Sequence, residues 1–96
     1  MAEYIFLMHD DAVTEDAAWE TYLQRLRRDG FFQGGSAIGG GVCIRKRGAP
    51  AALTAHLAGF MRVNAGSLHH ARSLLNGNPV FEAGGTVEIR TLPRTD

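Results

Sequence analysis

The residues with the clearest chemical potential lie near the start of the chain, where His9 is followed by Asp10 and Asp11. The apolar run before them predicts a strand, so these side chains stand at a strand end. A histidine beside carboxylates could act as a general base, because nearby negative charge raises its basicity. The simpler interpretation is a strand-to-helix turn whose solvated acids help to cap the next helix. We keep His9 and Asp10 as candidate catalytic residues beside that interpretation.

A second group of polar residues falls on two later strands. Arg62 and Arg90 could hold a carboxylate bidentately, with Glu88 orienting one of them. A cross-strand Arg–Glu ion pair at a dimer seam explains the same residues equally well. We therefore treat His56, Arg62, Glu88 and Arg90 as candidate substrate-binding residues at the edge or floor of a shared cavity.

The remaining motifs give little support for a metal or a cofactor. His69 and His70 are adjacent, so on a helix they point about a third of a turn apart. Cys43 is the single cysteine and has no ligand-spaced partner. The glycine-rich run 34–41 lacks the Lys-Ser/Thr ending of a phosphate-binding loop and fits a flexible or bulged hairpin. We expect no metal and no cofactor.

Apolar periodicity predicts the secondary structure that positions these residues. Alternation predicts strands over 3–8, 56–64 and 86–92, and a less regular strand pair within 31–46. Helical spacing predicts helices over 15–28 and after Ser67, the second ended by Gly77-Asn78-Pro79. Either Thr14 or Asp16 is expected to cap the first helix, and Gly30 to stop it.

The order of these elements predicts a single α+β domain over residues 1–96. It matches a ferredoxin-like antiparallel sheet with two helices on one face. Assigning sides by parity puts five apolar residues on the helix-free face, namely Tyr4, Phe6, Met8, Ala58 and Phe60. An apolar patch of that size is uncommon on a monomer. We therefore expect a homodimer in which two sheets pack face to face around a chamber.

Composition narrows the class of protein further. The chain is 45% hydrophobic and 21% charged, and its ten basic and ten acidic residues cancel. With no basic excess to neutralise phosphates, we expect no nucleic-acid partner. No apolar stretch is long enough to cross a bilayer, so we expect no membrane association. The first residues lack the features of a secretory signal, which makes the cytoplasm the expected location.

Five short segments follow one another along nearly the whole chain: YIFLMHDD (4–11), WETY (19–22), DGFFQGG (29–35), LAGF (57–60) and GTVEIRTL (85–92). In order and spacing they resemble the YCII-related (DGPF) family. The resemblance implies a dimeric α+β barrel, in which ferredoxin-like domains pair through their sheets. It also implies that most members lack an assigned activity and that some look like cofactor-free enzymes acting on small molecules.

The resemblance breaks at the positions that would carry catalysis. It implies a histidine on the first helix and an aspartate before a proline near the end of the second, positions held here by Tyr22 and Asn78. An amide does not titrate, and an unperturbed tyrosine loses its proton only near pH ~10. The family's Asp-Gly-Pro-Phe segment is replaced by residues 49–53. The fold therefore carries over and the catalytic role does not, although Tyr22 and Asn78 remain candidate catalytic positions.

Two functional hypotheses follow. The first is a dimer that binds a small molecule in a cavity near its interface. The alternative is a cofactor-independent isomerase, lyase or hydrolase acting on a small aromatic or carboxylated substrate. In that enzyme His9 or His56 would be the base, and Arg62 or Arg90 would hold the anion. Whether the protein is an enzyme stays open at the level of sequence.

Overall fold

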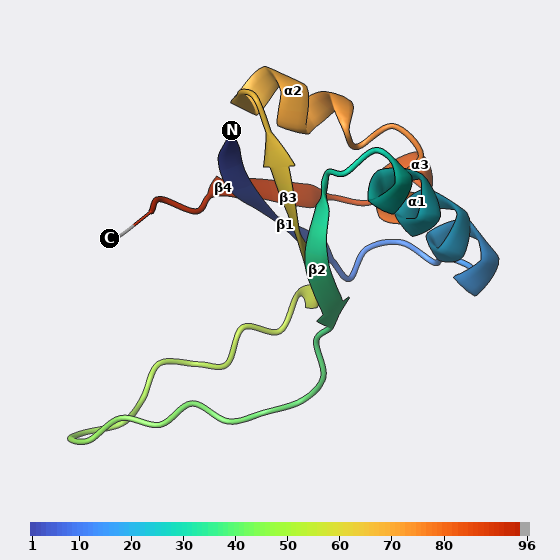
Figure 1. The fold of residues 1–96 in the computed structure, drawn as a ribbon. Coiled ribbons are helices and arrows are strands. Elements are labelled where there is room, and N and C mark those ends of the chain that lie inside the picture. Colours follow the sequence, from blue (N-terminus) through green and yellow to red (C-terminus); the bar gives the residue numbers. More distant parts are fainter. Residues whose placement is uncertain (95–96) are drawn as a thin grey trace.

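The computed structural model describes residues 1–94 as an α+β fold, in which a four-stranded antiparallel sheet packs against three helices (Figure 1). The strands are β1 (Ala2–His9), β2 (Phe32–Ala37), β3 (Leu57–Ala65) and β4 (Val87–Thr91). The helices are α1 (Asp16–Arg28), α2 (Leu68–Ser73) and α3 (Pro79–Glu82). Apart from the predicted strand pair and the second helix, these bounds lie within a residue or so of those predicted.

The strands lie in the order β2-β3-β1-β4, so β1 is an inner strand with an antiparallel neighbour on each side. Its residue Phe6 lies opposite Met61 of β3 and Ile89 of β4. Its residues alternate between buried and half-buried, so both faces of β1 carry apolar side chains that are largely shielded from water. β1 therefore connects β3 and β4 through backbone hydrogen bonds on both of its edges.

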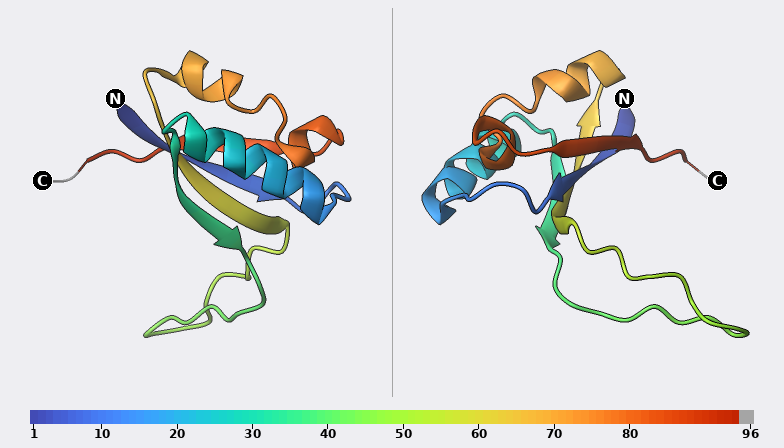
Figure 2. Two further views of the ribbon diagram at one scale, coloured as in Figure 1. Left: turned by 45° about the vertical axis from the view of Figure 1, so that its right-hand side comes forward. Right: turned by 180° about the vertical axis from the view of Figure 1, so that it is seen from behind.

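All three helices lie on one side of the sheet (Figure 2). The core fills the space between, and Phe6, Leu26, Met61 and Val63 are almost wholly buried there. Burying a side chain of this size contributes roughly 1.5–3 kcal/mol. The remaining core residues are Tyr4, Met8, Tyr22, Ala65, Ala71, Leu74, Leu75 and Val80.

The predicted assignment of sides on β1 was wrong. Tyr4, Phe6 and Met8 face the helices, and Ile5 and Leu7 are the half-buried residues between them. Residues directly opposite each other in an antiparallel pair share a face, and Leu7 lies opposite Phe60. The helix-free face is therefore built around three apolar residues: Ile5, Leu7 and Phe60. Alternation could not choose the side because both sets of residues on β1 are apolar.

The first helix begins one residue later than predicted, with Glu15 at its N-cap and no side-chain cap. Thr14 accepts a hydrogen bond from the indole Nε1 of Trp19 at 3.0 Å instead of capping the helix. At the other end Gly30 has a φ of +81°, the left-handed conformation that terminates a helix without strain in glycine. The predicted stop is thus in place.

The single second helix predicted from Ser67 is two helices. Ser67 caps α2 as expected, its hydroxyl accepting from the His70 N–H at 3.1 Å, but α2 ends at Ser73. Asn78 and Pro79, predicted to stop a helix, begin α3: the Asn78 Oδ1 accepts from the Phe81 N–H, and proline suits the first helical position. Within residues 1–94 no helix is long and apolar enough to span a membrane.

The strand pair predicted within 31–46 was also wrong. Only β2 forms there, and residues 38–56, called the arm below, run out and back without helix or strand (Figure 1). Gly39, Gly40 and Gly41 open the arm. Glycine loses more conformational freedom than other residues on entering a strand, which disfavours a hairpin here. The partner of β2 is β3, not the next segment of chain.

The close pairing of β2 with β3 predicts that Gly35 is required and that Gly40 is not. A Cβ on Gly35 would lie 2.5 Å from the Phe60 carbonyl oxygen and 2.8 Å from the Met61 Cα, whereas one on Gly40 would meet nothing within 4 Å. We expect Gly35→Ala to lower the free energy of unfolding by about 1–3 kcal/mol. The free energy of unfolding of the control Gly40→Ala, measured by urea denaturation, should stay within about 0.5 kcal/mol of the wild-type value. Equal stability of the two variants would contradict the β2–β3 register.

Candidate functional site

Four of the predicted site residues form one cluster where β1 ends. The Nε2 of His9 lies 3.2 Å from the Oε1 of Glu88, and Arg90 donates to the other Glu88 oxygen at 3.1 Å. The His56 ring packs edge-on against the His9 ring, with centroids 4.8 Å apart. Residues from β1, β4 and the end of the arm therefore meet at this end of the sheet.

Strand alternation places His9 in this cluster, because His9 is two residues after Leu7, which lies opposite Glu88. Met8 lies opposite Gly59 but His9 lies opposite Leu57, so one residue of β3 is skipped. The extra residue is Ala58 on β3, and the alternation of β1 itself continues through His9. With Nε2 protonated and donating to Glu88, the Nδ1 of His9 carries a lone pair. A histidine held in this way has the geometry of a general base positioned by a carboxylate.

The carboxylate of Glu88 is adapted to this pairing. The hydrogen bond with His9 lowers the pKa of Glu88 most, and the bond from Arg90 lowers it further. The side chain is 36% exposed, so solvent screens these interactions. Glu88 is therefore ionised at neutral pH and available to orient His9.

Arg62 lies in a different place from Arg90. Both residues lie opposite Ile5, on β3 and β4 respectively, which puts them two strand spacings or about 10 Å apart. Arg62 donates to Glu3 at 2.6 Å and to the Gln33 carbonyl at 2.8 Å. Each arginine thus has its own carboxylate, and the two do not converge on one point.

The two acids after His9 have different roles. The Asp10 N–H donates to the His56 carbonyl at 2.8 Å, which connects the end of β1 to the end of the arm. The Asp11 carboxylate accepts from the Thr86 N–H at 2.8 Å and from its hydroxyl at 2.7 Å. Asp11 therefore fixes the start of β4, two residues before Glu88. This matches the structural interpretation of the pair as part of a turn.

Tyr22 and Asn78 come together away from that cluster, in the core between α1, α2 and α3. The Tyr22 hydroxyl donates to the Leu74 carbonyl at 2.7 Å. Asn78 is fully buried, and its Oδ1 is used by the Phe81 N–H. Burial raises the pKa of Tyr22 to about 12, against smaller opposing effects of Asn78 and Arg25. Neither group can exchange a proton at neutral pH, so the pair serves packing and capping.

A pocket of about 500 Å³ opens between α1 and the neighbouring ends of β2 and β3. That volume is within the range of small-molecule sites. Its walls are mainly apolar and aromatic, formed by Met8, Trp19, Leu23, Phe32, Met61 and Val80. The polar lining residues are His9, Thr14, Asp16, Arg27 and Ser36. His9 is the residue shared by the pocket and the charged cluster.

Sequence reasoning missed most of this pocket, including Arg27, an exposed residue near the end of α1. Trp19, Leu23 and Arg27 follow one another at four-residue spacing, so they form a single stripe on α1 beside the core stripe of Tyr22 and Leu26. That spacing was the available signal. The Arg27 guanidinium lies 4.9 Å from the centre of the Phe32 ring. None of the ion pairs found within residues 1–94 includes Arg27.

The site can therefore enclose an apolar body and attract an anion through Arg27, and His9 is part of its lining while its imidazole contacts Glu88. Among residues 1–94 no three His, Cys, Asp or Glu side chains are grouped so that they could hold a metal ion. The fold and pocket define a small α+β protein with a ligand-sized cavity. No protein-family model matches the chain, and no curated protein matches it significantly.

Asp11 predicts how the fold responds to acid. Its hydrogen bonds from Thr86, the backbone one foremost, lower the pKa of Asp11 from its usual 3.8. A carboxyl whose pKa is lowered on folding stabilises the protein above its unfolded pKa and loses that effect as the pH falls through the folded pKa. We expect the melting temperature of the wild type to fall between roughly pH 5 and pH 2, and that of Asp11→Asn to fall less.

The matched control is Asp10→Asn, which removes a neighbouring carboxylate without touching Thr86. It should retain the wild-type dependence of melting temperature on pH. If Asp11→Asn and the wild type lose stability in parallel on acidification, the Asp11–Thr86 contact does not contribute in the way described.

Proposed function

We propose that this protein binds a small molecule with an apolar or aromatic body and a carboxylate group. The observation that carries the proposal is the pocket of about 500 Å³ between α1 and the ends of β2 and β3. Apolar walls with a few polar groups are typical of small-molecule sites. We expect the apolar body of the ligand to lie between Trp19 and Phe32.

Arg27 is the residue expected to recognise the anionic group. It lines the pocket with its guanidinium over the Phe32 ring. Arginine suits planar carboxylates because it can donate two parallel hydrogen bonds. Asp16 lines the same pocket but begins α1, eleven residues before Arg27 and so roughly 16 Å along the helix. The two charges therefore need not meet the same end of a ligand.

We also propose that two chains pair through the helix-free face as a dimeric α+β barrel. The strand order β2-β3-β1-β4 supports the ferredoxin-like arrangement predicted from the sequence. Ile5, Leu7 and Phe60 form an apolar centre, with Glu3–Arg62 on one side and Glu88–Arg90 on the other. An apolar centre with a polar rim is the usual anatomy of a protein interface. The resemblance to the YCII-related family and the cytoplasmic location remain predictions from sequence.

The alternative function, a cofactor-independent enzyme, is favoured by one specific observation. His9 lines the pocket, and its Nε2 is 3.2 Å from Glu88. Such an enzyme would use His9 as the base and Glu88 as a positioning residue. Tyr22 and Asn78 are not part of this alternative, because they are buried elsewhere and do not line the pocket.

Ligand binding can be measured with the protein's own fluorophore, because Trp19 is the single tryptophan and lines the pocket. We expect aromatic carboxylates such as benzoate and phenylacetate to change its fluorescence saturably. Arg27→Gln should weaken their binding about tenfold or more, since a hydrogen bond to a charged group contributes roughly 1.5–3 kcal/mol. The neutral amides benzamide and phenylacetamide should bind equally to wild type and variant.

The control for that experiment is Arg28→Gln, the next residue, whose side chain is 74% exposed and pairs with Asp29. It should leave the affinity for carboxylates unchanged. An equal loss in both arginine variants, or no saturable binding of any probe at millimolar concentration, would overturn the proposal. Turnover of a bound probe that disappears in His9→Gln would favour the enzyme instead.

Dimerisation through the helix-free face can be tested by a pair of identical substitutions. Leu7 lies at the centre of that face, whereas Leu68 is 51% exposed on α2, which packs on the other side. We expect the wild type to sediment as a dimer at micromolar concentration and Leu7→Glu to be largely monomeric, because a charge would be buried in the interface. Leu68→Glu should remain dimeric. A wild type that is monomeric at 100 µM (about the top of the usual working range) would refute this interface.

A further inference from the structure

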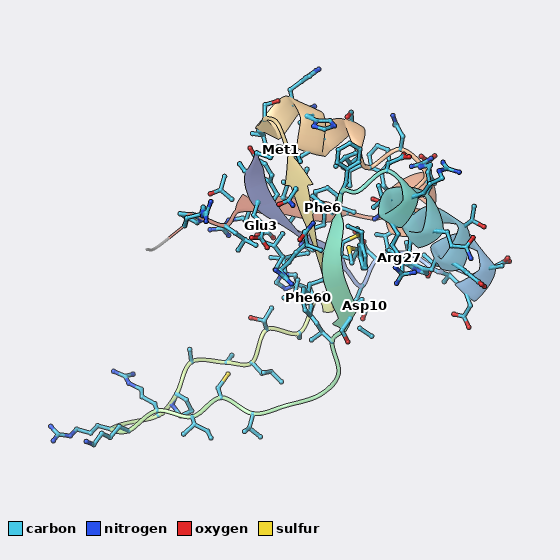
Figure 3. All side chains as sticks on the ribbon, in the orientation of Figure 1. Met1, Glu3, Phe6, Asp10, Arg27 and Phe60 are labelled. Atoms are coloured by element: carbon cyan, nitrogen blue, oxygen red, sulfur yellow. The ribbon has the colours of Figure 1, made fainter. Side chains whose placement is uncertain are left out.

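The arm leaves the sheet at the ends of β2 and β3 and extends on the side opposite the helices (Figure 2). Its side chains stand clear of the rest of the molecule (Figure 3). Between residues 39 and 55 the described chain forms no backbone–backbone hydrogen bond, so its two limbs do not pair with each other. A segment with so many unpaired backbone groups and no packing of its own is poorly stabilised within one chain.

The arm also exposes large apolar side chains to solvent. Val42 is 79% exposed and Ile44 is 87% exposed. They are two residues apart, so in an extended chain they lie on the same side. Adjacent exposed apolar groups of this kind are typical of a contact surface.

Charge indicates what the arm contacts. Its tip carries Arg45, Lys46 and Arg47, and residues 38–56 include no acidic residue. The complementary surface is the acidic segment, residues 10–20, which holds Asp10, Asp11, Glu15, Asp16 and Glu20 and no lysine or arginine. All five acids are exposed. The acidic segment leads into α1, whereas the tip points away from α1 on the other side of the sheet (Figure 2).

We propose that the arm binds a second copy of this chain. Its basic tip contacts the partner's acidic segment, and Val42 and Ile44 pack on the partner. This rests on the helix-free-face dimer proposed above. Each limb of eight or nine residues can span about 26 Å, whereas stacked sheets lie roughly 10 Å apart. The arm is thus long enough to pass the partner's sheet and reach its helix layer. Two-fold symmetry forms the contact twice.

The decisive experiment is a charge exchange read by sedimentation equilibrium. Arg45→Glu/Arg47→Glu should weaken dimerisation about tenfold at low salt, since several exposed ion pairs are lost twice, and less at 0.5 M NaCl. Adding Glu15→Lys/Glu20→Lys should restore the affinity to within about threefold, because the attraction is re-formed with signs reversed. The matched control Arg72→Glu/Arg94→Glu makes the same charge change at exposed positions outside the arm and should have no effect.

The outcomes separate the two proposals. A monomeric wild type overturns both the dimer and the arm contact. If Leu7→Glu breaks the dimer but Arg45→Glu/Arg47→Glu leaves the dimerisation affinity unchanged, the arm contact alone is overturned. Loss of binding to single-stranded RNA or anionic vesicles on reversal of the tip, with dimerisation unchanged, would assign the arm to a polyanion and also overturn it.

Cys43 provides an independent test, because it is the single cysteine and lies exposed on the arm. A maleimide–benzophenone label at Cys43, photolysed in mixed ¹⁴N and ¹⁵N dimers, should join the arm of one isotope to residues 10–20 of the other. Cross-links confined to one isotope would contradict the proposal. Cys43→Ser is the control for labelling.

Discussion

The packing of β1 against the helices is the interaction on which the rest of the structure depends. Tyr4, Phe6 and Met8 are buried beneath α1 and beside β3, and each contributes roughly 1.5–3 kcal/mol by leaving water. Because side chains alternate along a strand, burying this set leaves Ile5 and Leu7 on the other face. One choice of side therefore creates both the core and the surface proposed for dimerisation.

The same strand also organises the polar site. Strand alternation puts His9 on the face of Glu88, and Asp11 holds the start of β4 through Thr86. The two side chains therefore lie 3.2 Å apart although 79 residues separate them in the sequence. This cluster borders the pocket through His9, whereas Tyr22 and Asn78 are enclosed in the core. The two sets of candidate site residues thus have separate uses: His9 and Glu88 lie at the end of the sheet, and Tyr22 and Asn78 serve packing and capping.

The arm shows a comparable dependence on context. A hairpin needs its two limbs to exchange hydrogen bonds, and the glycines at 39–41 make that ordering unfavourable within one chain. β2 nevertheless forms, because Gly35 allows the backbone of β3 to approach closely. Strand formation here is determined by the neighbouring strand rather than by the residues of the segment. Between β2 and β3, the arm has no such neighbouring strand among residues 1–94.

The sequence by itself determined β1, β3, β4 and α1, the caps at Ser67 and Gly30, and the grouping of charged residues on the last strands, because these follow from local spacing and backbone preference. It could not determine which side of β1 faces the helices, since both sides are apolar. Nor could it place Arg27 in a pocket or separate Arg62 from Arg90. Those arrangements depend on register between strands distant in sequence and on how α1 lies across the sheet, which only tertiary packing decides.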